Sequence, residues 1–171
     1  MDREIYISGG AVSLAEYLPA DARDCYDCWL DPDVQSGYNY AIKQTFKEFA
    51  DMKPKGRFFA VIVENETGNA AGVIGLSPEG SPPDLAIRLF RPYRGKGYGT
   101  EAFLLGIAYC FDALKLDKIY AGCYQHNAAS LKMLAKCGFE PHPEGNVNEK
   151  HYLTGEPLVQ YDYVLYAPPR G

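Results

Sequence analysis

Apolar positions in the first fifty residues recur three and four apart, the spacing at which side chains share one face of a helix. They predict one helix that opens at Pro19 and ends at Asp31, because the residue before Pro32 disfavours helical backbone. They predict a second helix from about Tyr40 to Ala50. The apolar faces consist of Ala22, Cys25, Tyr26 and Trp29 in the first helix and of Ile42, Phe46 and Phe49 in the second.

In the middle of the chain the pattern changes to that of strands. Arg57–Glu64 and Ala70–Leu76 are two apolar runs on either side of the turn Asn65–Asn69. Two such runs around a short polar turn predict an antiparallel hairpin. A loop at 77–83 then leads to a third strand, Asp84–Phe90.

The second half of the chain alternates between helix and strand. A helix of about fifteen residues follows a glycine-rich turn, and a strand follows it at Ile119–Tyr124. Asn127 is a good cap for a further helix and Gly138 a good residue to end it. The last strand is predicted at Val159–Tyr166, and a short first strand at Glu4–Ile7. The apolar stripes of the two helices are Phe103, Ile107, Phe111 and Leu114, and Leu131, Leu134 and Ala135.

Helices first, then an antiparallel meander, then alternating strands and helices predict an α/β (α+β) domain around one central sheet. The 171 residues suffice for one hydrophobic core and contain no internal repeat. We therefore expect a single domain that spans residues 1–171.

Composition and charge narrow the functional classes. Apolar residues make up 47% of the chain and charged residues 23%, values typical of globular proteins. The net charge of −5 argues against a nucleic-acid partner and is weakly favourable to a cationic substrate. No apolar run is long enough to span a membrane, and the first residues lack an apolar signal core, so we expect a cytoplasmic protein without a membrane partner.

The five cysteines are an odd number without a secretory signal, which argues against a disulfide framework. Cys25 and Cys28 have the spacing of a redox or zinc motif, but they lie within a helical pattern and no second Cys/His pair follows. We interpret them as small buried helix residues and expect no metal site.

Within the stretch RPYRGKGYGTEA, residues 91–102, two cations and three glycines fall in the six residues 94–99, just before the long helix. It does not match a phosphate-binding P-loop, because no Gly-Lys-Ser/Thr occurs, nor a dinucleotide fingerprint, because its glycines are spaced G-x-G-x-G. Glycines let an anion approach the backbone, and the free N–H groups of the helix point into the turn. The turn predicts a diphosphate site.

The motif Arg94-x-x-Gly97-x-Gly99, followed by a strand and then by the stretch NAASLKMLAKCGF at 127–139, resembles the GCN5-related N-acetyltransferases (GNAT). It is most similar to the branch with ribosomal-protein N-terminal and polyamine acetyltransferases, as is the early stretch LDPDV at 30–34. The resemblance covers about residues 18–140. It implies a mixed, mostly antiparallel twisted sheet flanked by helices, with a V-shaped splay between the strands at about 84–90 and 119–124.

The resemblance implies acetyl-coenzyme A as the cosubstrate, with its diphosphate in the glycine turn and its pantetheine arm in the splay. A backbone N–H would polarise the thioester carbonyl. Asn127 would contact the cofactor's amide arm or serve only as a helix cap. Carried over by position, the cofactor-binding residues are Leu89, Phe90, Arg94, Gly95, Lys96, Gly97, Tyr98, Gly99, Thr100, Asn127 and Ser130.

The implied reaction is direct attack of a primary amine on the thioester in a ternary complex. Asp84 or Glu79 is the candidate general base, since an amine must first lose a proton. Leu134 stands where many members carry the tyrosine that protonates the leaving thiolate. The acid is therefore left open among Tyr124, Ser130, Cys137 and water; Ser130 is retained as the third candidate catalytic residue.

The acceptor is expected to be a small amine or a protein N-terminus, bound between the early helices and the tail. Tyr38, Tyr40 and Tyr152 are the candidate contacts, with Tyr161 beside them, and His126 and His151 are interpreted as surface residues. A homodimer is left open. The alternative function is an acyl-CoA-binding sensor or partner protein that lacks turnover, which the missing tyrosine favours.

Overall fold

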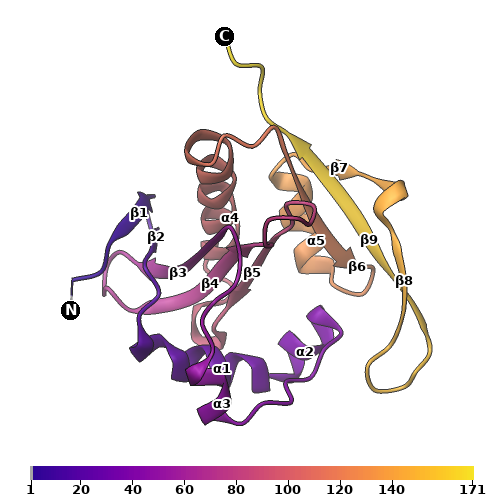
Figure 1. Ribbon diagram of the computed structural model, residues 1–171, viewed down its shortest axis with the longest axis horizontal. Helices are drawn as coiled ribbons and strands as arrows, with labels where there is room; N and C mark the ends of the chain where they lie inside the picture. The colour runs from indigo at the N-terminus through magenta and orange to yellow at the C-terminus, as the bar shows by residue number, and fades with distance from the viewer. Residues whose placement is uncertain (1) are drawn as a thin grey trace.

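The computed structural model describes residues 2–171 and contains two antiparallel sheets (Figure 1). The first has five strands in chain order, and the second has β9 at its centre with β6 on one side and β7 and β8 on the other. The strands of the first sheet are β1 Ile5–Ser8, β2 Val12–Ala15, β3 Phe58–Glu64, β4 Ala70–Leu76 and β5 Leu85–Leu89. Those of the second are β6 Lys118–Tyr124, β7 Glu140–Pro141, β8 Val147–Lys150 and β9 Pro157–Tyr166.

Helices cover both faces of the first sheet. They are α1 Ala22–Leu30, α2 Pro32–Tyr38, α3 Phe46–Asp51, α4 Tyr98–Ala108 and α5 Ala128–Lys136. Alternate residues of β3 face opposite ways, as in any strand. Ile62 packs in the core that includes Phe103 of α4, and Val61 packs in the core that includes Cys25 of α1. The final turn of the long helix, Tyr109–Ala113, is a wider π-helical turn.

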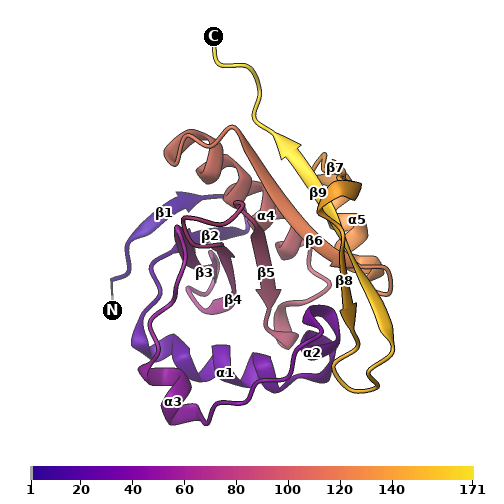
Figure 2. The ribbon, with the colours of Figure 1, turned by 45° about the vertical axis from the view of Figure 1, so that its right-hand side comes forward.

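The two sheets meet at the start of β5 and then separate. Asp84 and Tyr120 form a parallel bridge, and the Tyr120 N–H donates to the Pro83 carbonyl at 2.8 Å. Beyond this point β5 and β6 diverge toward α2 (Figure 2). The predicted α/β (α+β) fold with its V-shaped splay is confirmed.

The helix predicted at 40–50 is wrong in its first half. α3 begins only at Phe46, because Thr45 caps it: its Oγ1 accepts from the Glu48 N–H and its own N–H donates to the Glu48 carboxylate. Asp31-Pro32 ends α1 as predicted, but it also starts α2, since Asp31 accepts from the Asp33 N–H. Proline is well tolerated in the first turn of a helix.

Three strands were also missed. β7 has only two residues and pairs with β9. β2 is a short, entirely buried run with no alternation to reveal it. β8 is polar and is a strand because it pairs with β9. The predicted assignment of Cys25 and Cys28 as buried helix residues is confirmed, and all five thiols are free. Among residues 2–171 no helix is long and apolar enough to cross a membrane.

Asn39 fastens the second sheet's outer hairpin to the helical layer. Its backbone is left-handed, with φ of 50°. Its Nδ2 donates to the Lys150 carbonyl at 2.9 Å and its Oδ1 accepts from the Tyr152 N–H at 2.8 Å. One side chain thus satisfies two backbone groups of the β8–β9 turn.

We predict that Asn39→Gly lowers the free energy of unfolding by about 1–2 kcal/mol, because glycine accepts the left-handed backbone and only the two hydrogen bonds are lost. Urea unfolding measures the change, and amide exchange should quicken at 147–157. Asn148→Gly on exposed β8 is the control for the effect of a new glycine in the hairpin. Equal losses in the two variants would contradict the assignment.

Candidate active site

The glycine turn leaves an open cradle at the start of α4. Gly95 and Gly97 have φ values of 76° and 82°, a conformation that other residues rarely adopt. A Cβ built on either residue would meet no atom within 4 Å, so the space above the turn is free. Within residues 2–171, the amides from Gly95 to Thr100 have no hydrogen-bond acceptor. The cradle therefore fits an anion such as a diphosphate.

A cavity of about 500 Å³ extends from this cradle to the start of α5. Its walls include Gly95, Gly97, Thr100 and Asn127. A narrower cavity of about 110 Å³ continues from it between β5 and β6 as far as Asp84. The two share Gly37, Tyr38, Ile87, Asn127, Ser130 and Met133. Together they form a channel from the glycine turn to the point where the sheets meet.

The edge of β5 supplies backbone groups to this channel. The backbone N–H and C=O groups of Asp84 and Phe90 point toward β4. The Ser77 N–H donates to the Asp84 carbonyl, and the Phe90 N–H donates to the Ala71 carbonyl. By the alternation of an antiparallel ladder, Ile87 and Leu89 direct theirs into the splay. Tyr38 Oη donates to the Ile87 carbonyl at 2.5 Å.

The two cations of the turn are already engaged. Arg94 donates to the Leu89 carbonyl at 3.1 Å and lies 3.0 Å from the Asp31 carboxylate. The Lys96 ammonium lies 3.6 Å from Glu64 and above the Tyr98 ring. Both cations reinforce the positive potential of the turn, and a direct contact of either with a diphosphate stays a prediction.

Asp84 is the titratable group at the inner end of the channel. It lines both the narrow cavity and a second cavity of about 220 Å³ on the α1 face of the sheet. Burial raises the pKa of this carboxyl to about 7, and the negative charge of Asp162 adds to the shift. A carboxylate with a pKa near neutrality, placed between two cavities, is suited to accept a proton.

The acetyltransferase (GNAT) domain family matches residues 12–140, well over half of the chain. The chain belongs to the GNAT acetyltransferase family. The family's reaction class is acyl transfer to an amine. The assignment of the open splay and the glycine turn to the cofactor stays a prediction.

Relatives agree with this membership. The chain is 39% identical over 67 residues to the probable N-acetyltransferase YjcK of Bacillus subtilis, a match of 39% of this chain and 36% of that protein. It is 27% identical over 149 residues to the uncharacterized N-acetyltransferase p20 of Bacillus licheniformis, 80% of this chain and 82% of that one. Spermidine N-acetyltransferase from Vibrio cholerae, solved with CoA and spermine, superposes with a TM-score of 0.81 at 17% identity over 92% and 96% of the chains.

The remaining candidate catalytic residues of this GNAT protein divide into those inside and outside the channel. Ser130 lines both channel cavities. Tyr124 lines the inner one, but its hydroxyl donates to Glu149, and burial raises its pKa. Glu79 is exposed on the 77–83 loop and lines none of the cavities described here, and Cys137 is buried in the core. Among the predicted bases, the structure brings only Asp84 to the channel.

Asn127 caps a helix and also lies on the wall of the channel. Its Oδ1 accepts from the Ser130 N–H at 3.2 Å, which caps α5, and it also lines both channel cavities. Leu134, in place of the family's tyrosine, is buried with 2% exposure at the end of the inner cavity. The chain therefore offers no hydroxyl at that position.

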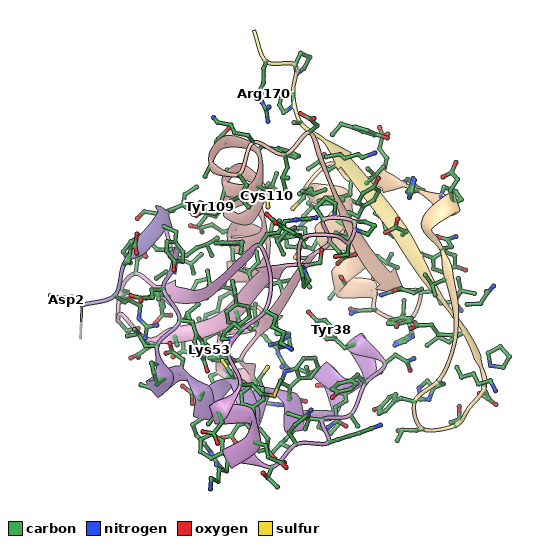
Figure 3. All side chains as sticks on the ribbon, in the orientation of Figure 1. Asp2, Tyr38, Lys53, Tyr109, Cys110 and Arg170 are labelled. Atoms are coloured by element: carbon green, nitrogen blue, oxygen red, sulfur yellow. The ribbon has the colours of Figure 1, made fainter. Side chains whose placement is uncertain are left out.

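The candidate acceptor tyrosines do not gather in one place. Tyr38 lies on the side of α2 that faces the splay (Figure 3) and lines the channel. Tyr40 packs edge-on against Trp29, with ring centroids 5.5 Å apart. Tyr152 lies in the β8–β9 turn, and the Tyr161 hydroxyl donates to Gln125 Oε1 at 3.5 Å. The candidate surface residue His126 is indeed exposed, and His151 accepts N–H groups within its own turn.

The cavity on the α1 face is lined by residues that were not predicted. Phe59, Arg88 and Lys55 line it and also a neighbouring cavity of about 200 Å³. The signal was present for Arg88, which is a charge inside the apolar strand LAIRLF and shares a face with Asp84. In the described residues no group of three or more His, Cys, Asp or Glu side chains could hold a metal.

We predict that Gly97→Val weakens coenzyme A binding roughly tenfold or more, since hydrogen bonds to a charged group are worth about 1.5–3 kcal/mol each. The valine would strain the left-handed backbone and fill the space above the amides. Isothermal calorimetry with coenzyme A measures the effect.

The control is Gly155→Val in the β8–β9 turn, where φ is 73° and a Cβ is equally unobstructed. It carries the same backbone strain but lies outside the channel. If the two variants bind coenzyme A equally well, the cradle is not the diphosphate site.

Proposed function

We propose that this protein transfers an acetyl group from acetyl-coenzyme A to a primary amine, with Asp84 as the general base. The observation that supports this most is the position of Asp84, which lines the channel from the glycine turn and the cavity on the α1 face. Cofactor and acceptor would enter from these two sides and meet at one carboxylate.

The channel fits acetyl-coenzyme A in chemistry as well as extent. The amides from Gly95 to Thr100 would hold the diphosphate, and Asn127 the amide arm. The N–H groups of Ile87 and Leu89 would pair with the pantetheine and polarise the thioester carbonyl, as a preorganised oxyanion donor does. When bound, the cofactor supplies an acetyl carbon that forms a bond to the amine nitrogen while the carbon–sulfur bond breaks and its electron pair leaves with the sulfur.

Asp84 solves the protonation problem of the amine. An ammonium with a pKa near 10 holds its proton at neutral pH, and only the free base is a nucleophile. Asp84, with its pKa near 7, takes that proton directly or through one water. Ser130 lines both channel cavities and is a candidate to protonate the leaving sulfur, although a thiol with a pKa near 8.5 also leaves unaided.

An amine panel tests the function. Purified protein, acetyl-coenzyme A and a set of primary amines and peptide N-termini should release free thiol and form the acetylated amine. Tight coenzyme A binding with no turnover on any amine would instead support the acyl-CoA sensor. Thermal stabilisation by ATP or NAD but not by coenzyme A would contradict both the acetyltransferase and the sensor function.

We predict that Asp84→Asn lowers kcat/KM by roughly 10²–10⁴-fold at pH 7.5, the range of a general base. The wild-type pH profile should show an inflection near 7 that the variant lacks. Glu79→Gln is the matched control, because it removes the other candidate carboxylate from an exposed loop. Loss of activity in Glu79→Gln with retention in Asp84→Asn would reverse the assignment.

We further predict that Asp84→Asn is more stable than the wild type at pH 8, by about 1–4 kcal/mol, since one pKa unit corresponds to about 1.4 kcal/mol. The folded protein holds the Asp84 proton more tightly than the unfolded chain does, so wild-type stability falls between about pH 4 and pH 7. Urea unfolding at pH 4 and pH 8 measures this. A difference that does not grow with pH would refute the buried, raised-pKa carboxyl.

A further inference from the structure

The acceptor side of the proposed site is cationic, although the chain as a whole carries −5. The inference below rests on the proposed function. The two cavities on the α1 face share Phe59, Arg88 and Lys55, and Lys53 lines the outer one. Among the described residues, Asp84 is the only acidic one that lines either cavity. Two cations, Lys55 and Arg88, line the cavity in front of the candidate base, and Lys53 adds a third in the outer cavity.

Arg88 is the unusual member of the three. It lies inside β5, opposite Val73, and its Nε is buried without a hydrogen-bond partner. Among the described residues, no carboxylate lies within 4.0 Å of its guanidinium. Its Cζ lies 4.2 Å from the centre of the Trp29 ring and 5.7 Å from that of Tyr38. Stacking covers one face of the guanidinium. Its Nε lacks a partner, and Arg88 lines the larger channel cavity as well as both cavities on the α1 face, so a ligand can reach it.

Neighbouring arginines show that such isolation is not general in this protein. Arg91 and Arg94 both pair with Asp31, and Arg3 pairs with Asp21 at 2.7 Å. A partly buried cation without a counterion costs free energy, which an anion in the cavity would offset. The planar guanidinium favours a two-pronged contact with a carboxylate or phosphate.

The size of the cavities limits what this anion belongs to. They measure about 220 and 200 Å³, the scale of a small molecule rather than of a folded partner. Their apolar walls come from Phe59, Phe49 and Val73. Lys53, on the α1 side of the sheet in Figure 3, and Lys55 are exposed at the rim, where they would attract an anionic molecule.

We propose that the acceptor is a small primary amine that also carries an anionic group, a carboxylate or a phosphate. Arg88 binds the anion and Asp84 receives the proton of the amine. Both side chains stand on the same face of β5, four residues apart, so one molecule can contact them at its two ends. A polyamine, by contrast, would bring further positive charge to a site that already holds Arg88, Lys53 and Lys55.

Paired amines that differ only in the anion test this specificity. The pairs are 4-aminobutyrate and propylamine, phenylalanine and phenethylamine, and O-phosphoethanolamine and ethanolamine; the last separates phosphate from carboxylate. In the wild type the anionic member of at least one pair should have a kcat/KM roughly 10- to 100-fold higher, the effect of a charge-assisted hydrogen bond. Spermidine as the best acceptor, or no preference in any pair, overturns the proposal.

Variants of Arg88 assign the preference to this residue. Arg88→Met keeps the unbranched stem beneath Trp29 and should bring the ratio within each pair close to one, mainly through KM. Because Arg88 also lines the larger channel cavity, the Kd of coenzyme A is measured alongside and should change less than this ratio. Arg88→Lys keeps the charge and should keep part of the ratio. Lys47→Gln removes one charge from the exposed side of α3, outside the cavities, and should change nothing. If Arg88→Met weakens coenzyme A binding and leaves the ratio intact, Arg88 belongs to the cofactor site and the proposal fails.

Two measurements need no variant, and the second of them needs no turnover. Butyrate should inhibit competitively against the amine, whereas uncharged butanamide should not, and equal inhibition overturns the proposal. Calorimetry on the cofactor-free protein should show 4-aminobutyrate binding more tightly than propylamine. Charge-dependent binding without any turnover would refute the proposed function and leave the anion site standing. Turnover without charge dependence would support the proposed function and overturn the anion site.

Discussion

Asp84 and Tyr120 join the two sheets through a parallel bridge, and their strands separate on one side of it. Parallel strands that cannot continue their ladder leave backbone N–H groups free, and β5 keeps those of Ile87 and Leu89 directed into the splay. The same bridge places the Asp84 carboxyl at the narrow end of the channel. The channel for the cofactor and the location of the candidate base therefore follow from one contact.

Local electrostatics at the site differ from those of the whole molecule. Burial and the charge of Asp162 keep the Asp84 proton in place up to about pH 7, which favours the role of a base at physiological pH. A few residues along the same strand, Arg88 stacks on Trp29 without a carboxylate within reach. The cavities on the α1 face thus carry positive charge on a protein whose net charge is negative.

Sequence motifs and the spacing of apolar residues predicted those elements that depend on neighbouring residues. The glycine turn, the capped helix at Asn127 and the strands β3 to β6 could be recognised because turn chemistry and apolar spacing are written in neighbouring residues. The prediction failed where distant partners decide the outcome. β8 is a strand because it pairs with β9, and Tyr40 packs on Trp29 instead of starting a helix.

The amino-acid sequence by itself determined the family, the position of the glycine cradle and two candidate bases, because each rests on residue types at fixed spacing. Only the tertiary structure decided the surroundings of the two carboxyls, since Asp84 is largely buried where the sheets meet and Glu79 is exposed. It likewise moved the candidate acceptor site from the tyrosines to Arg88, Lys55 and Phe59. Pairing, burial and isolation from a counterion depend on residues far apart in the chain, and no local pattern records them.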